Sequence, residues 1–238
     1  MSIIYMKKPI NLSIYITLKT YNDIKNKVKK ITEIPKQNID YLPFSNKKRV
    51  YFNENDNSFY LYKKNKLNKW KINLKFIKIQ FNQEFIEYMN LILDKAIFEA
   101  KTIFKKDKDD ICFKEKQNGT LKSAIYSIIN KFAYFEGELD IFDFVTEIFI
   151  RVLSGHYLID GNKRTSLMIL ILLLKQFGYY FYWSNQNNIF FIQNYKKHIE
   201  KDLEIFTYEL QEKNKVEYIT LEIKKWIYSK TMIDLNFK

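Results

Sequence analysis

The nine residues from His156 to Arg164, HYLIDGNKR, concentrate the side chains of this chain that are best suited to chemistry. An imidazole such as His156 is the usual group for taking up a proton near neutral pH. Asp160 is a hard oxygen ligand of the kind that Mg²⁺ takes alongside phosphate oxygens and waters. Lys163 is a mobile point charge, and Arg164 is a fork that can bind two phosphate oxygens. The combination predicts a site that holds a triphosphate and its metal beside a general base.

A strongly apolar segment follows this stretch and predicts a helix from Thr165 to Phe177, closed by Gly178. The run Leu167–Leu174 is apolar all round, which indicates a helix buried on every side. A loop that enters a helix N-terminus points unpaired N–H groups outward, where the helix dipole favours an anion. Gly161 allows backbone conformations closed to other residues and a close approach to a ligand. Two cations in this place oppose the dipole, so they indicate a bound anion.

Each residue alone also has an ordinary structural explanation. A histidine before a helix is usually a satisfied surface or core residue, and Asp-Gly-Asn is usually a turn. A Lys-Arg pair is usually a solvated face. The chain, however, has two histidines and three arginines, which makes His156 and Arg164 rare residue types here. Their combination in one short window therefore favours a functional site.

Composition predicts a folded protein of ordinary size. The 238 residues are 47% hydrophobic and 17% aromatic, enough for one sizeable core, or one domain with an appendage. Cys112, the single cysteine, excludes an internal disulfide framework and fits a reducing compartment. No segment approaches the roughly 18 apolar residues that span a bilayer. We therefore expect a soluble cytoplasmic protein with no membrane association.

The net charge of +13 raises the question of a nucleic-acid partner. The cations are 37 lysines and 3 arginines, whereas base readers and phosphate clamps usually rely on arginine forks. The excess of lysine therefore indicates a solvated surface, and a nucleic-acid partner is not expected.

The first 80 residues show strand patterns. Apolar and polar positions alternate from Ile10 to Leu18, and residues 49–62 read as a hairpin. A third alternating segment runs from Trp70 to Phe76, and a lysine-rich helical run precedes Pro35. We predict that residues 1–80 form a separate α+β region with β-strands, of unknown role.

From residue 81 the spacing of apolar residues becomes helical. Asp140 is a predicted N-cap for a helix that ends at Ser154-Gly155. The other predicted helices begin near Phe81, include Ala124–Ile129, and span about 193–213 and 217–229. We therefore predict a mainly α fold in which residues 81–238 form a helical domain.

The stretch at residues 156–164 resembles the signature of the Fic/Doc family, H-x-F-x-[D/E/N]-[G/A]-N-[G/K]-R. Upstream, NGTLKSAI (118–125) is similar to the flap-and-helix segment of death-on-curing (Doc) proteins. A closing segment with Glu222, Trp226 and Ile227 is also similar. The resemblance covers about residues 82–230, with strong specificity at 156–164, and nothing in residues 1–80 matches.

This resemblance implies a Fic/Doc-like helical bundle with a short β flap over the active site. It implies that His156 is the general base acting on a target hydroxyl and that Asp160 holds Mg²⁺. Two further groups of residues have implied roles: Gly161, Asn162, Lys163 and Arg164 bind the phosphates of ATP, and Asn118, Gly119, Thr120 and Leu121 clamp an extended target segment by strand addition.

Two positions separate the branches of the family. Adenylylating Fic proteins carry a second glycine where this chain has Lys163 and a further arginine where it has Leu167, so both positions match Doc. The resemblance then implies transfer of the terminal phosphoryl group of ATP to a Ser or Thr of a target protein, elongation factor Tu being the best-known target type. The sequence lacks the inhibitory helix pattern [S/T]-x-x-x-E-[G/N], so restraint of this toxin is expected from a separate antitoxin protein.

Two departures keep other functions open. The usual Phe that anchors the loop is Leu158 here, and the usual Pro or small residue after the histidine is Tyr157, which could crowd the base. One alternative is a Fic-type protein adenylyltransferase. Another is a non-catalytic module that keeps the fold and binds a nucleotide, a protein or nucleic acid.

Overall fold

The computed structural model describes residues 10–14, 48–53, 58–63, 69–76, 79–103, 113–136, 140–181, 183–185, 188–190, 198–211 and 216–233. The chain divides into two compact units, one of residues 79–176 and 192–230, the other of residues 1–78, 177–191 and 231–238. The division into domains 1–80 and 81–238 stays a prediction. The helix expected before Pro35 lies outside the described residues.

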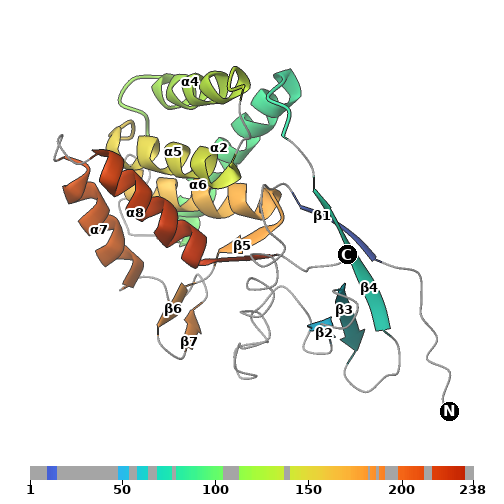
Figure 1. Ribbon diagram of the computed structural model, residues 1–238. Coiled ribbons are helices and arrows are strands. Elements are labelled where there is room, and N and C mark those ends of the chain that lie inside the picture. The colour runs from blue at the N-terminus through green and yellow to red at the C-terminus, as the bar shows by residue number, and fades with distance from the viewer. Residues whose placement is uncertain are drawn as a thin grey trace, which may run out of the picture. The chain divides into compact units, whose positions relative to one another are not determined.

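Helices dominate the described part of the chain, which confirms the mainly α fold class expected from the sequence. None of them combines the length and the apolarity that a membrane crossing requires. The six described helices are α2 (Gln83–Ile103), α4 (Thr120–Ala133), α5 (Ile141–Ser154), α6 (Asn162–Gln176), α7 (His198–Glu209) and α8 (Val216–Ser229) (Figure 1).

Helix α6 forms the centre of the helical unit. It packs against α5 and α2, and α4 lies on the other side of α5 (Figure 1). Its residues from Thr165 to Leu174 are buried except Ile171 and Leu172, which are half-buried. The prediction of an all-round buried helix is therefore correct apart from these two positions. Gly178, two residues beyond its end, has a φ of +85°, as expected after a helix.

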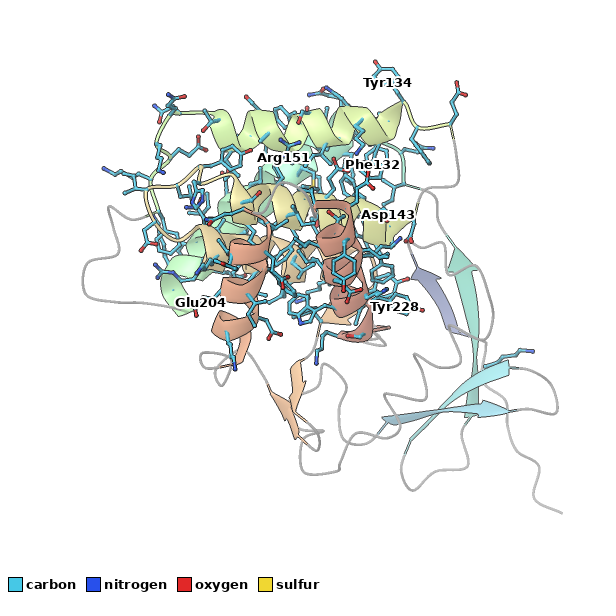
Figure 2. The ribbon with its side chains drawn as sticks, turned by 60° about the vertical axis from the view of Figure 1, so that its left-hand side comes forward. Phe132, Tyr134, Asp143, Arg151, Glu204 and Tyr228 are labelled. Carbon is cyan, nitrogen blue, oxygen red and sulfur yellow. The ribbon has the colours of Figure 1, made fainter. Side chains whose placement is uncertain are left out.

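Helix α5 begins where the sequence predicts. Asp140 has an extended backbone, and its Oδ1 accepts a hydrogen bond of 2.9 Å from the N–H of Phe142. Lys224 of α8 reaches the same place, with its Nζ 2.6 Å from Asp140 Oδ2 and 2.6 Å from Asp143 Oδ1. Figure 2 labels Asp143, with Tyr228 of α8 on the same side of the unit. This clamp joins the start of α5 to α8.

The Lys224 ammonium is stabilised by the clamp. Desolvation by burial lowers the pKa of Lys224, but its hydrogen bonds with Asp140 and Asp143 and their charges outweigh that effect. The net result is a Lys224 pKa above its ordinary value.

Trp226 joins α8 to two other helices. Its ring stacks on Phe149 of α5 at a centroid distance of 6.1 Å and meets Phe206 of α7 edge-on at 5.2 Å. Its indole N–H donates a 2.8 Å hydrogen bond to Asp202 of α7. Ile227 beside it is fully buried. Trp226 and Ile227, which belong to the segment singled out in the sequence together with Glu222, therefore pack α8 against α5 and α7.

The other unit contains a four-stranded sheet of order β1-β4-β3-β2. Its strands are β1 (Ile10–Ile14), β2 (Lys48–Asn53), β3 (Ser58–Lys63) and β4 (Lys69–Phe76). The predicted hairpin is confirmed as β2 and β3, which pair antiparallel, whereas β1 pairs parallel with β4. Two small antiparallel pairs complete the described strands: β5 (Tyr179–Phe181) with β8 (Thr231–Ile233), and β6 (Trp183–Asn185) with β7 (Asn188–Phe190).

Candidate functional site

Of the predicted site residues, His156, Asp160 and Gly161 lie in the loop that joins α5 to α6, and Asn162, Lys163 and Arg164 form the first turn of α6, all within the helical unit. His156 is exposed, and its φ of +48° is the one positive value among the described non-glycine residues. Left-handed backbone costs an ordinary residue roughly 1–2 kcal/mol, so the surrounding loop must impose it. The structure therefore holds His156 on the surface in a conformation that the chain would not adopt unaided.

Tyr157 supplies part of this constraint. A Cβ at Gly155 would collide with the Tyr157 ring and would lie 2.6 Å from the carbonyl oxygen of Arg151. The half-buried ring therefore folds back over Gly155, at the end of α5. The aromatic side chain that the sequence marks as an obstacle thus packs against the backbone that precedes His156.

Leu158 anchors the loop despite its departure from the usual Phe. Its side chain is fully buried. The Asn162 amide clasps its backbone, because Leu158 N–H donates to Asn162 Oδ1 at 2.9 Å and Asn162 Nδ2 donates to the Leu158 carbonyl at 2.9 Å. Asn162 therefore closes the turn between the loop and α6.

The segment Lys114–Lys116 pairs with the loop through a single β-bridge. Lys116 N–H donates to the Tyr157 carbonyl at 2.8 Å, and Ile159 N–H donates to the Lys114 carbonyl at 2.9 Å. Glu115 faces Leu158 in this short antiparallel bridge. One carboxylate oxygen of Glu115, Oε2, is buried and has no hydrogen-bond partner among the described residues. These hydrogen bonds hold the loop residues that follow His156 against the segment Lys114–Lys116.

Gly161 turns the chain into α6. Its φ is +85°, which favours glycine, and its carbonyl accepts a 2.8 Å hydrogen bond from Thr165 N–H. Helix α6 consequently begins at Asn162, three residues before the predicted start at Thr165. A Cβ at Gly161 would lie 2.6 Å from Phe113 Cε1, so this backbone lies close against an aromatic ring.

Arg164 and Asp160 form an ion pair one helical turn apart. Arg164 Nη2 lies 3.1 Å from Asp160 Oδ2, and the other carboxylate oxygen accepts a 2.6 Å hydrogen bond from Gly161 N–H. The Arg164 side chain is 17% exposed, whereas that of Asp160 is 65% exposed. The Arg164 guanidinium carbon lies 4.7 Å from the centre of the Phe113 ring. Arg164 is therefore held from two sides, and Asp160 faces solvent.

The first turn of α6 is positive. It contains Lys163 and Arg164 and no acidic residue. The Lys163 side chain is half-buried. The helix dipole and two cations therefore add up in one place, next to the loop that carries the exposed His156 and Asp160. This arrangement can hold a phosphorylated ligand against a general base.

The predicted flap residues, Asn118 to Leu121, lie in a turn and at the start of α4. Thr120 and Leu121 are the first residues of α4, and Leu121 is buried. Gly119 precedes the helix with a φ of +80°, and Thr120 Oγ1 donates to the Gln117 carbonyl at 2.8 Å. Asn118 is exposed in the turn before it. Residues 118–121 are thus a turn and a helix start, and the β-bridge to the loop is made by Lys114–Lys116.

The donor set agrees with a magnesium site that depends on the nucleotide. Mg²⁺ is commonly bound by one or two carboxylates together with phosphate oxygens and waters. Asp160 is such a carboxylate, exposed and next to the cations that would hold phosphate. No group of three or more potential metal ligands occurs in the described part of the chain. The residues thus fit Mg²⁺ that arrives with a triphosphate.

Sequence reasoning missed Phe113 and the segment Lys114–Lys116. Phe113 is 3% exposed and contacts the motif at both Gly161 and Arg164. Its signal in the sequence was weak: an aromatic residue just after the polar run KKDKDD. Its partners are about fifty residues away along the chain, so no local pattern connects them.

Comparison with protein-family models finds one match, to the Fic/DOC family, over residues 79–174. The matched range runs from just before α2 into α6 and contains the whole loop with His156, Asp160 and Arg164. Members of this family generally transfer nucleotide or phosphate groups to proteins. No curated protein and no solved structure matches the chain.

Proposed function

We propose that this chain is a Doc-like toxin that transfers the γ-phosphoryl group of ATP to a Ser or Thr hydroxyl of a target protein. Two findings support transfer to a protein: the match of residues 79–174 to the Fic/DOC family and the exposed position of His156 beside a positive helix start. The observation that carries the proposal is that the loop with His156 and Asp160 leads directly into the first turn of α6, where Arg164 pairs with Asp160.

The reaction would need little covalent chemistry from the protein. The target hydroxyl gives its proton to the His156 imidazole as its oxygen bonds to the γ-phosphorus. The bond between that phosphorus and the oxygen that bridges it to the β-phosphate breaks, and ADP leaves with the electron pair. Lys163 and Arg164 offset the phosphate charge. Positioning and charge neutralisation of this kind supply most of the catalysis in phosphoryl transfer.

Asp160 is the residue that would hold Mg²⁺, which when bound neutralises phosphate charge. Its present hydrogen bond with Arg164 at 3.1 Å means that the two share one small region. A metal ligand and a phosphate-binding cation placed so close would engage the same nucleotide.

Position 167 supports transfer of the γ-phosphoryl group over transfer of the adenylyl group. Adenylylating relatives are expected to have an arginine there, whereas Leu167 is 1% exposed in the core of α6. Lys163 replaces the small glycine of that branch with a half-buried cation. The phosphate-binding set is therefore Lys163 and Arg164, which favours the Doc-like orientation of the nucleotide.

The target segment would bind beside the loop. The sequence assigned this role to Asn118, Gly119, Thr120 and Leu121, but the segment that forms a β-bridge with the loop is Lys114–Lys116. In its antiparallel bridge, Lys114 and Lys116 use backbone groups toward the loop, and the backbone groups of Glu115 between them point the other way. An extended target segment would add at that edge. A translation factor such as elongation factor Tu is the proposed kind of target, and a separate antitoxin the proposed restraint.

The test is a labelling assay in a bacterial lysate with ATP labelled at the α- or at the γ-phosphate, comparing wild type with His156→Ala. We expect a protein band labelled from γ alone and absent with His156→Ala. Label from α would assign the chain to the adenylylating branch. The absence of label from either position, together with full ATP binding, would favour a non-catalytic nucleotide-binding module.

Expression in bacteria provides a second test of the toxin role. Wild type is expected to arrest growth and His156→Ala to relieve the arrest. A binding module would arrest growth in neither case. A nucleic-acid-binding module would show an affinity that falls steeply with salt and is unaffected by His156→Ala.

A further inference from the structure

We infer that Phe113 is a positioning residue of the phosphate site: its ring holds the Arg164 guanidinium in the position from which it binds a phosphate. The inference rests on the proposed nucleotide-binding role of Arg164 and deepens it. Phe113 lies outside the loop, about fifty residues before Arg164 in the sequence, and no residue pattern of the motif includes it.

The ring is fixed by burial. Phe113 is 3% exposed, and the chain direction after it is set by the bridge of Lys114–Lys116 to the loop. Lys101, near the end of α2, places its Nζ 5.9 Å from the ring centre. Phe113 therefore stands as a rigid support between α2 and the start of α6.

Arg164 uses this support. Its guanidinium carbon lies 4.7 Å from the ring centre, within the range of a cation–π contact. Asp160 holds the same group through Nη2 at 3.1 Å. A long arginine side chain loses considerable rotamer freedom when it binds a phosphate. A ring that already restricts the guanidinium lowers that entropic cost at the moment of binding.

The same ring accounts for the glycine of the motif. A Cβ at Gly161 would lie 2.6 Å from Phe113 Cε1, 2.9 Å from Cδ1 and 3.0 Å from Cζ. Phe113 thus occupies the space that a side chain at position 161 would need. The positions of Gly161 and Arg164 are therefore set by one aromatic side chain.

The first experiment observes Arg164 without any nucleotide. The chain has three arginines, so an Nε–Hε NMR spectrum of ¹⁵N-labelled protein contains few signals, and Arg164→Lys assigns the one from Arg164. Protons above a ring face resonate upfield, so we expect the Arg164 signal upfield of a free arginine and shifted back in Phe113→Met. Methionine keeps an apolar side chain of similar length without a ring. An Arg164 signal at the free-arginine position in wild type would overturn the inference, even if Phe113→Met failed to fold.

The second experiment measures the dissociation constant for ATP with Mg²⁺ by calorimetry. Phe113→Met is expected to weaken ATP binding about two- to tenfold, and Phe113→Tyr, which keeps the ring, to restore most of it. In an Arg164→Lys background the Phe113→Met effect should largely vanish, because the two residues act as a unit. An equal effect in both backgrounds would overturn the inference and assign Phe113 a purely structural role.

Phe132 offers a matched control. It is a half-buried phenylalanine of α4 whose ring carries Lys131 Nζ at 5.7 Å, away from the loop (Figure 2). Phe132→Met should leave both the Arg164 signal and the affinity for ATP unchanged. If wild type bound no ATP, the proposed function would be wrong, whereas the NMR experiment would still decide whether Phe113 holds Arg164.

Discussion

Helices α5 and α6 are consecutive in the chain and belong to the same unit, and the side chains at their N-termini carry charges of opposite sign. The start of α5 carries two carboxylates: Asp140 caps the helix, and Asp143 lies in its first turn. The start of α6 carries no acidic residue and has Lys163 and Arg164 in its first turn. The side-chain amide of Asn162, the first residue of α6, is bonded to the Leu158 backbone.

The difference lies in the sign of the side-chain charge at each helix start. Negative charge near a helix N-terminus is stabilising, and the chain provides it at α5 from its own residues. The surplus charge there is then balanced by Lys224. At α6 the first turn carries two cations instead, and the Asp160 carboxylate before the helix pairs with Arg164. Under the proposed function, the phosphates of ATP would add negative charge at this helix start.

The largest expected effect is on the rate of protein labelling, and it distinguishes the start of α6 from the start of α5. His156→Ala, beside the start of α6, should lower the rate of protein labelling from ATP by about 10²- to 10⁴-fold, the usual contribution of a general base. Its melting temperature should stay at the wild-type value because the side chain is exposed. Asp140→Ala at α5 should do the reverse. It should leave the labelling rate at 25 °C unchanged and lower the free energy of unfolding by about 1 kcal/mol, because α5 loses its N-cap. Loss of labelling in Asp140→Ala with an intact fold would contradict the division of roles.

A pair of glycine substitutions tests how closely the backbone before the start of α6 is packed. Gly161→Ala should lower the free energy of unfolding by about 2–4 kcal/mol, because left-handed backbone and a collision with Phe113 add up. Gly119→Ala is the control, since it has a similar φ of +80° and nothing within 4 Å of an added Cβ. It should cost about 1 kcal/mol, from the backbone alone. Urea denaturation of both variants measures the difference, and equal losses would refute the role of the Phe113 contact.

Two neighbouring lysines of α8 test the clamp at α5. Lys224→Met should lower the free energy of unfolding by about 1 kcal/mol, because it leaves Asp140 and Asp143 without their partner. Lys225→Met is the control: that side chain is 62% exposed, against 26% for Lys224, and pairs only with Glu222 in its own helix. Little change is expected there.

The pH dependence of the same pair follows from the raised pKa of Lys224, which its two carboxylate partners cause against the effect of burial. A cation with a raised pKa contributes stability that is fully present below its ordinary value, near 10.5, and is lost as pH rises through the folded-state value. The stability difference between wild type and Lys224→Met should therefore stay constant from about pH 7 to 10 and shrink only above that range. A difference that vanished by pH 9 would show that the clamp does not hold the charged form.

The smallest effect has the opposite sign. Lys163→Glu places a negative charge at the start of α6 and should raise the free energy of unfolding by about 0.3–1 kcal/mol. The same change should weaken ATP binding, because a cation facing the phosphates becomes an anion. Thermal unfolding and calorimetry measure the two effects. A variant that lost both stability and affinity would indicate that Lys163 has a structural role.

Much of this molecule follows from local patterns. Apolar spacing predicted the positions of α5 and α8 to within a residue or two, and Asp140 was recognised as a cap because its side chain acts on the next few N–H groups. The β2–β3 hairpin was predicted for the same reason, since alternation and a polar turn are local properties. The start of α6 was placed three residues late, because the turn at Gly161 depends on the clasp between Leu158 and Asn162.

The flap assignment marks the limit of such patterns. Residues 118–121 were expected to bind a target segment by strand addition, whereas Thr120 and Leu121 belong to α4, because Leu121 belongs to the same buried face as Ile125 and Ile128. The β-bridge forms at Lys114–Lys116, where the loop provides backbone partners. A short strand is made by its partner, and the partner here is more than forty residues away.

The sequence by itself determined which chemical groups this protein brings to one place, because His156, Asp160, Lys163 and Arg164 are neighbours along the chain and no fold could separate them far. It also determined that a buried helix follows them, since an all-round apolar run must be buried. Only the tertiary structure decided how these groups are held. The support of Arg164 by Phe113, the bridge below the loop and the clamp of Lys224 on α5 join residues distant in sequence. Such contacts form because a folded core brings together side chains that no short stretch of sequence relates.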